Sequence, residues 1–328
     1  MKASAQHLLP ALVAALVLAA CGSSSDPADS AQASPAGAAA VPSSVKAVIA
    51  TDHGPSAFAV DASAIYVANH RGGTLQRIDP TTNRITASVS IGGQVNITNG
   101  EPPTWACTNT DGQVHRIDVT SMTVVSSTPA GCDGGSLSVI GTTVWSVPGG
   151  DGGGRQQVVL FDAATGKRIS SFPMPPGASG GPAVPAGRAV VIGGGSGAPT
   201  YTPAGKALVD RGVDLSWLVQ PIAGRLYRVP ESGLITELDP TTMKSVSTIA
   251  APPHQGDWNW ALAGDGKGHL WYRPDYTHLY QVDIASKKVS LILTLPWEEA
   301  PTGIWYAFDS LWVSNFDADT VWRVDVSG

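Results

Sequence analysis

The chain has 328 residues, of which 43% are hydrophobic and 14% are charged, and its formal charge at pH 7 is -6. This length is enough to bury a large core, and the mildly acidic balance lacks the basic surface that nucleic-acid binding needs. The 37 glycines and 25 prolines suit many tight turns between short strands. We therefore expect a turn-rich globular protein that has no nucleic-acid partner.

The first segment, residues 1–20, is predicted to be a signal peptide. It has an early cation, Lys2, and an apolar run, Leu8–Leu18, that is too short to span a bilayer. The four residues that end at Cys21 read LAAC and resemble the lipobox of bacterial lipoproteins. That resemblance implies cleavage before Cys21 and acylation of this residue, with palmitate among the expected chains. An ordinary signal peptide followed by an incidental cysteine is the alternative.

Residues 21–44 are mainly Ser, Ala, Pro, Gly and Asp, with almost nothing to bury. Such a composition favours a disordered tether. Two or more acyl chains on Cys21 would anchor the chain stably. The expected location is therefore extracytoplasmic, as a bacterial membrane-anchored lipoprotein whose folded head begins at residue 45.

From residue 45 to residue 328 the chain repeats at a period of about 40 residues. Each unit contains an aromatic or β-branched anchor in one strand and an Asp at the end of the next. The anchors are Tyr66, Trp105, Trp145, Val190, Tyr227, Trp271 and Trp312. The aspartates are Asp79, Asp118, Asp162, Asp239, Asp283 and Asp325, and the fourth unit has lost its Asp. Because Asp followed by Pro or Thr caps its own turn, we interpret these carboxylates as structural.

Seven units of four short strands predict an all-β, seven-bladed β-propeller of four-stranded antiparallel blades. The last unit stops after its third strand, and Val45–Thr51 resembles the outer strands of the other units. The N-terminal strand is therefore predicted to complete the last blade and close the ring, which removes the open sheet edges.

Two segments, YVANHRGGTLQRIDPTTNRI at Tyr66–Ile85 and WVSNFDADTVWRVDV at Trp312–Val326, resemble the YVTN-type β-propeller repeat. This resemblance covers the whole predicted head and implies a fold without specifying an activity. Related propellers include the streptogramin lyases, the gluconolactonase-type enzymes and many non-catalytic surface proteins.

Two functions from different classes follow. The first is a ligand-binding, partner-binding or scaffold protein of the cell envelope, expected to be a monomer, with no identified cofactor. It is favoured because no local catalytic motif is present and because a fold does not by itself imply chemistry. The alternative is a metal-assisted lyase or lactonase resembling streptogramin lyase, which would need a divalent ion such as Mg²⁺ or Ca²⁺ in the channel. A quinone-dependent dehydrogenase is less favoured, since no cofactor ligand pattern is legible.

The candidate ligand site lies at the channel mouth, where loops cross from an outer strand to the next innermost strand. Trp258 and Trp297 fall in or beside the crossing loops of blades six and seven, and large aromatic surface beside a few polar groups suits a small-molecule or peptide site. The predicted site comprises His53, His254, Asp257, Trp258, Tyr276, Trp297 and Glu298. The alternative is that the two tryptophans pack beneath long loops.

With Cys21 acylated, Cys107 and Cys132 remain in an oxidising compartment. They form either a disulfide or two buried thiols.

Overall fold

In the computed structural model, the described residues are 42–98, 104–130, 135–149, 156–174, 181–192, 200–208, 219–230, 232–254, 261–296 and 301–326. All of them belong to one compact unit, Ala40–Gly328. Their regular structure is entirely β-strand. Within these ranges, no helix is present that is long and apolar enough to span a bilayer.

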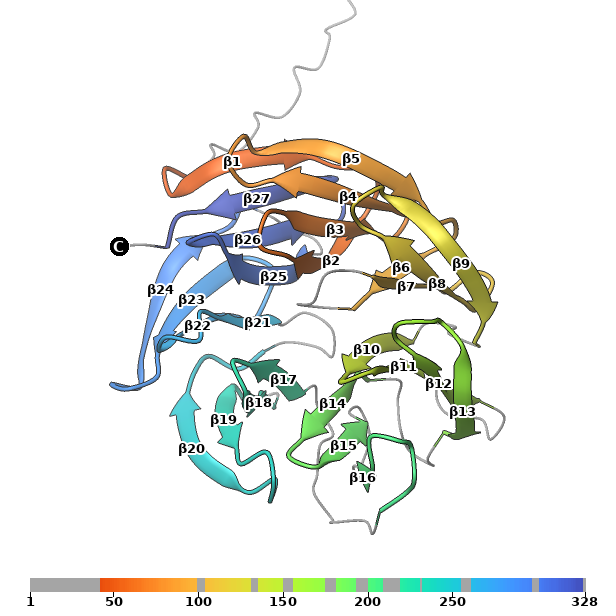
Figure 1. The fold of residues 1–328 in the computed structure, drawn as a ribbon. Coiled ribbons are helices and arrows are strands. Elements are labelled where there is room, and N and C mark those ends of the chain that lie inside the picture. The colour runs from red at the N-terminus through yellow and green to blue at the C-terminus, as the bar shows by residue number, and fades with distance from the viewer. Residues whose placement is uncertain are drawn as a thin grey trace, which may run out of the picture. The chain divides into compact units, whose positions relative to one another are not determined.

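The strands form seven sheets, which we call blades one to seven in chain order (Figure 1). Blade one contains β2 (Pro55–Val60), β3 (Ile65–Asn69), β4 (Thr74–Asp79) and β5 (Arg84–Ser90). Blade two contains β6 (Val95–Ile97), β7 (Trp105–Thr108), β8 (Gln113–Asp118) and β9 (Thr123–Pro129). Blade three contains β10 (Ser136–Ile140), β11 (Thr143–Val147), β12 (Gln157–Asp162) and β13 (Arg168–Pro173). Blades four and five contain β14 (Ala183–Ala186), β15 (Ala189–Ile192) and β16 (Thr200–Tyr201); and β17 (Val219–Ile222), β18 (Arg225–Arg228), β19 (Leu234–Leu238) and β20 (Ser245–Ala250). Blades six and seven contain β21 (Ala261–Gly264), β22 (His269–Arg273), β23 (His278–Asp283) and β24 (Lys288–Thr294); and β25 (Pro301–Ala307), β26 (Ser310–Asn315), β27 (Thr320–Val324) and β1 (Val45–Ala50).

The ring closes as the sequence predicts. Strand β1 pairs antiparallel with β27, with Val45 opposite Val324 and Ala50 opposite Thr320. Figure 1 shows the first strand of the chain beside the last, and the seven sheets arranged around a common centre. The predicted seven-bladed propeller, closed by its N-terminal strand, is confirmed.

The repeated aspartates are structural, also as predicted. Asp79 Oδ1 accepts hydrogen bonds from the backbone N–H groups of Thr81 (2.7 Å) and Thr82 (3.4 Å). Asp239 does the same with Thr241 and Thr242, at 3.0 and 2.6 Å. Each carboxylate thereby satisfies donors in the tight turn before an outer strand. These backbone hydrogen bonds also lower the pKa of the capping carboxyls.

The hydrophobic core lies in the seams between blades. Seven clusters of buried side chains each combine residues from two adjacent blades, so that every seam has its own core. Trp145 packs into the seam with blade four, Trp271 into the seam with blade seven, and Trp312 into the seam between blades seven and one. A single four-stranded sheet would leave these faces wet, so stacking the blades is what stabilises them.

Blade four departs from the predicted four strands. Its described residues form three strands, and a single bridge from Tyr201 to Ala207 stands where a fourth strand would begin. The blade lacks the Asp of the repeat, and Thr202 takes over part of its role: its Oγ1 accepts a hydrogen bond from the Lys206 N–H at 3.1 Å.

Candidate functional site

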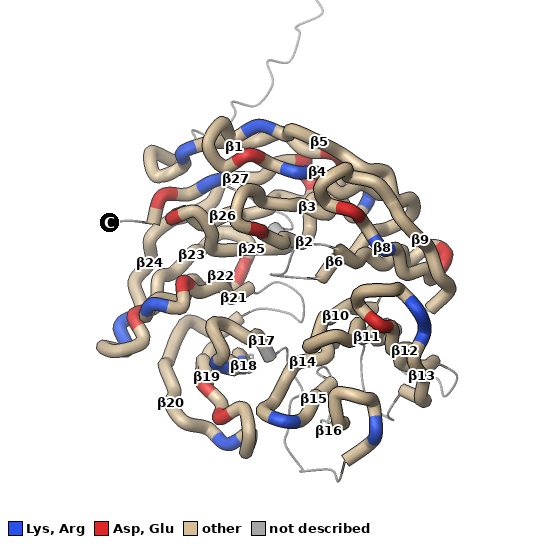
Figure 2. The backbone as a smooth tube through the Cα atoms, viewed as in Figure 1, with Lys and Arg blue, Asp and Glu red and all other residues tan. Residues whose placement is uncertain are grey.

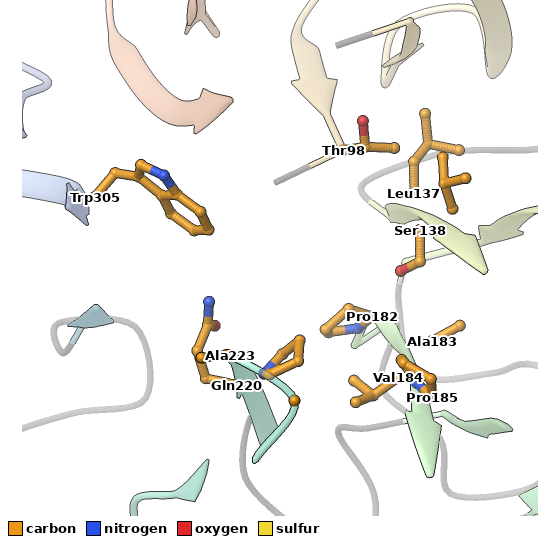
Figure 3. Close-up of a pocket in the computed structure, with 13 residues that line it drawn as sticks. Thr98, Leu137, Ser138, Pro182, Ala183, Val184, Pro185, Gln220, Ala223 and Trp305 are labelled. Atoms are coloured by element: carbon orange, nitrogen blue, oxygen red, sulfur yellow. The ribbon is translucent and has the colours of Figure 1, made fainter. Parts of the chain in front are cut away.

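A cavity of about 390 Å³ opens between the innermost strands of the ring. Its walls come from the end of β6, from β10 and β14, from β17 and the turn after it, and from β25. Figure 3 shows Trp305 of blade seven on one side and the Pro182–Pro185 segment of blade four on the other. We call this space the central cavity. Its volume falls within the range of small-molecule sites.

Five lining residues occupy one repeated position, the innermost-strand residue opposite the anchor of the same blade. They are Thr98, Ser138, Pro185, Gln220 and Trp305, opposite Trp105, Trp145, Val190, Tyr227 and Trp312 respectively. In the other two blades this position is alanine, Ala59 and Ala263, and neither lines the cavity. Because residues paired across an antiparallel ladder share a face, the register of the blades sets the chemistry of the cavity wall.

The wall combines one large aromatic surface with a few neutral polar groups. Trp305 is partly buried and packs against the seam between blades seven and one. In Figure 3 the Gln220 amide points toward the space below Trp305, and Ser138 lies on the opposite side, above Pro182. Gln220 offers both a donor and an acceptor, whereas a hydroxyl can play either role. This arrangement suits a ligand with an apolar face and several hydrogen-bonding edges.

Thr98 adds a buried polar group to the same wall. The residue is 1% exposed, and its Oγ1 has no hydrogen-bond partner in the described structure. A buried hydroxyl without a partner costs about 1–3 kcal/mol, so such atoms call for an explanation. A polar ligand in the central cavity, or water that occupies it, would supply the missing partner.

None of the 13 described residues that line the central cavity is charged. Figure 2 shows Lys and Arg interspersed with Asp and Glu over the outer strands and turns of the ring. An ionised ligand would lose its hydration beside these residues without gaining a counter-charge from them, and that loss is costly. The described part of the wall therefore suits an uncharged ligand.

A smaller cavity of about 100 Å³ adjoins the central one. It shares Gln220 and Trp305 and extends toward Ala263 and Tyr306, between the inner strands of blades five, six and seven. The Tyr306 ring stacks on Trp271 with centroids 4.6 Å apart and an interplanar angle of 6°. This stacking holds the strand that carries Trp305 against its neighbour, which limits the movement of the wall.

Three residues of the site predicted from the sequence are described, namely His53, His254 and Tyr276, and none of the three lines the central cavity. Asp257, Trp258, Trp297 and Glu298 lie outside the described residues, so their part of the prediction stays a prediction. His53 is exposed, and its Nδ1 lies 2.8 Å from Asp319 Oδ2, which ties the crossing loop into blade one to the β26–β27 loop.

The two other predicted residues that are described lie in blade six or beside it. His254 is 5% exposed and follows β20. Tyr276 lies in the β22–β23 loop, three residues after the fully buried Arg273. Burial lowers the pKa of Arg273 to about 10, against the opposing effects of Asp275 and Tyr276, so the guanidinium stays charged at neutral pH. No described contact joins His53 to His254 or Tyr276.

Sequence reasoning missed Gln220 and Trp305 because it placed the site among the crossing loops. The signal that could have found them is the repeat itself, since both lie opposite an anchor. Tryptophan at a position that is alanine in two other blades is the irregularity to look for.

Two further predictions concern a metal and a disulfide. Within the described ranges, no three His, Cys, Asp or Glu side chains come together in a way that could hold a metal ion. Cys107 is fully buried and disulfide-bonded. Cys132 lies outside the described residues, so the pairing of these two cysteines stays a prediction.

Comparisons with known proteins show the fold and leave the activity open. No protein-family model matches the sequence, and no curated protein matches it. Among solved structures, a β-propeller domain of Cps50 (Swd1) from Myceliophteria thermophila aligns with a TM-score of 0.66 and 10% identity, covering 87% of this chain and all of that one. Hydrazine synthase from Kuenenia stuttgartiensis aligns with a TM-score of 0.62 and 12% identity, covering 84% of this chain and 96% of that one. At these identities the similarity shows a shared fold, the seven-bladed β-propeller.

Proposed function

We propose that this chain is a binding protein of the cell envelope that takes up an uncharged ligand in the central cavity of its propeller. The observation that carries the proposal is the wall of that cavity, which combines Trp305, the Gln220 amide and neutral hydroxyls and has no charged side chain among its described residues. Such a wall suits a small molecule, or an uncharged segment of a partner, that has one apolar face and polar edges. The YVTN-type relationship proposed from the repeats is consistent with a surface-displayed propeller of this kind.

The test is a thermal-shift screen of uncharged small molecules against the purified protein, repeated on three variants. Gln220→Leu removes the amide from the cavity wall, and Trp305→Ala removes the aromatic surface. Gln281→Leu is the control, because it makes the same substitution as Gln220→Leu at a residue of β23 outside the cavity. A ligand at 100 times its Kd stabilises the wild type by about 2.7 kcal/mol. We expect this stabilisation to persist in Gln281→Leu and to be lost in the two cavity variants.

Two results would contradict the proposal. One is a screen in which no uncharged compound stabilises the wild type. The other is stabilisation that is equal in Gln220→Leu and Gln281→Leu. Ligand effects that disappear with a chelator and return with Mg²⁺ or Ca²⁺ would favour the metal-assisted lyase or lactonase instead.

We also propose that the chain is anchored outside the cytoplasm through acyl groups on Cys21. The support is the sequence alone: a short apolar run, the residues LAAC and a tether that cannot fold by itself. In cells given a radiolabelled fatty acid, we expect the wild type to incorporate label and to fractionate with membranes. Cys21→Ser should do neither. Equal labelling of both would overturn the anchor.

A further inference from the structure

Blade two contains a chain of hydrogen bonds that ends on an exposed serine. His115 of β8 is 5% exposed, and its Nδ1 lies 2.8 Å from the Oγ of Ser127 on the outer strand β9. The other ring nitrogen, Nε2, lies 3.1 Å from Thr108 Oγ1 at the end of β7. The Thr108 hydroxyl in turn donates a short hydrogen bond to the carboxylate of Asp111. Three strands and one turn therefore contribute to a single network.

The acceptors in this network determine where each proton lies. The hydrogen bond from Thr108 is the main cause that lowers the pKa of Asp111, so its carboxylate is ionised and can only accept. The Thr108 proton therefore points toward Asp111, and the Thr108 oxygen must accept from His115 Nε2–H. A neutral imidazole that carries its proton on Nε2 has a lone pair on Nδ1. Consequently the Ser127 hydroxyl donates to His115.

This arrangement separates His115 from four other described histidines. In His53, His269 and His278 the Nδ1 atom faces an Asp carboxylate, and in His70 it faces a backbone carbonyl. Carboxylates and carbonyls only accept, so Nδ1 carries a proton in each of these residues. The Thr277 hydroxyl also lies 2.9 Å from His278 Nδ1, but the Asp275 carboxylate lies 2.8 Å from the same nitrogen. This nitrogen therefore donates its proton to Asp275 and does not accept one from Thr277. In His115, by contrast, Nδ1 faces a hydroxyl.

The imidazole is also held in its basic form. Burial lowers the pKa of His115, and the opposing charge of Asp111 is the smaller influence. At neutral pH His115 is therefore uncharged and able to take up a proton. Ser127 itself is exposed on the outer strand, where a reagent from solvent can reach it.

From this geometry we infer that Ser127 is an activated serine, with His115 as its general base and Thr108 and Asp111 as positioning residues. A nucleophile within hydrogen-bond reach of a base, with the base oriented by a third group, is the arrangement that activates serine. The site takes small activated acyl or phosphoryl donors, because it lies open on a strand surface. It is a covalent modification site on the rim of blade two and is independent of the central cavity.

The reaction balances without a cofactor. With an activated ester, the Ser127 Oγ forms a bond to the acyl carbon while its proton passes to His115 Nδ1. The bond from that carbon to the leaving oxygen then breaks, and the leaving group departs with the electron pair and takes the proton from the imidazolium or from water. With a fluorophosphonate, Oγ bonds to phosphorus and fluoride leaves.

The experiment treats the full chain with a biotinylated fluorophosphonate at pH 7.5 and maps the adduct by peptide mass spectrometry. Ser126 provides the internal control, because it is also exposed on β9 but lies beside Gly166 on the other face of the blade. General-base assistance contributes about 10²–10⁴-fold, so we expect the adduct on Ser127 to form at least about 100 times faster than on Ser126. Ser127→Ala should lose this adduct, and Ser126→Ala should keep it.

Further arms separate activation from accessibility. His115→Gln should lower the labelling rate at least 10-fold with Ser127 still present; because this variant is at risk of unfolding, the pH profile of the wild type is the second measurement. Labelling should fall at low pH with the midpoint at which His115 titrates by NMR. The inference is overturned if Ser126 and Ser127 label at equal rates, if Ser127→Ala labels like the wild type, or if the rate is independent of His115 titration.

Discussion

The ring-closing strand β1 allows a sharp test of what holds the propeller together. Its two faces differ: Ile49 is 5% exposed and packs with Phe58, Trp312 and Val321 in the seam between blades seven and one, whereas Val48 is 45% exposed on the other face. Both residues pair with β27, Val48 opposite Trp322 and Ile49 opposite Val321. Truncating each to alanine therefore changes seam packing in one variant and leaves it intact in the other.

The expected magnitudes differ severalfold. Ile49→Ala removes three buried carbons and leaves a cavity beside Trp312, a change that costs about 2–5 kcal/mol. Val48→Ala loses only strand propensity and partly exposed surface, and should cost less than about 1 kcal/mol. The exposed ion pair between Lys46 and Asp325, at 3.2 Å, contributes at most about 1 kcal/mol and does not change this ranking. Since whole domains are stable by about 5–15 kcal/mol, the Ile49 change is a large fraction of the total.

The assay is equilibrium urea unfolding followed by tryptophan fluorescence, with the midpoint and slope fitted for the wild type and both variants. Equal free energies of unfolding for Ile49→Ala and Val48→Ala would refute the argument that β1 closes the ring through its seam face. Deleting Val45–Thr51 extends the test, because it strips β27 of its partner and exposes a sheet edge. We expect no soluble folded protein; a deletion variant with a near-wild-type melting temperature would refute closure.

Three further predictions follow from single residues. The folded-state pKa of His115 lies below its unfolded value. The stability that the neutral imidazole contributes is therefore present above about pH 6.5 and is lost as the pH falls through the folded pKa. His115→Gln should flatten this part of the stability–pH curve, as measured by urea unfolding. Lys287 is exposed and has a φ of 59°, a conformation that glycine adopts without strain. Lys287→Gly should therefore stabilise the protein by up to about 1 kcal/mol. The same change at Lys288, which lies in β24, should destabilise the protein by about 0.5–1 kcal/mol. Reducing the disulfide of Cys107 should lower the free energy of unfolding by about 2–5 kcal/mol, and nonreducing peptide mapping should identify its partner; unchanged stability after verified reduction would contradict a structural role.

The sequence by itself determined the architecture, because the signals for it are local and repeated. Asp79 and Asp239 cap turns in the structure as their neighbours Thr81 and Thr241 indicate. A turn of this kind needs only a few consecutive residues, so it is legible without the fold. Trp271 and Trp312 likewise recur at the repeat period, and both pack in blade seams. The closing strand was legible because the last repeat lacks an outer strand and the segment before the first repeat resembles one.

The site could not be predicted in the same way, because its members are brought together only by closure of the ring. Thr98, Gln220 and Trp305 are far apart in the chain, and no local pattern marks them as neighbours. Their common face depends on which strand of each blade is innermost and on the register that sets each opposite an anchor. A shift of one residue in that register would turn each side chain to the other face of its sheet.

The network in blade two shows the same division. That Ser127 and Thr108 are ordinary strand residues is legible from the sequence, but that they meet the two nitrogens of one histidine depends on the pairing of β7, β8 and β9. Turn chemistry and periodic burial act over a few residues, and the sequence therefore determined the blades, their number and the strand that closes them. Contacts between blades and across strands depend on register and on ring closure, so only the tertiary structure decided which side chains share the cavity and which nitrogen of His115 faces Ser127.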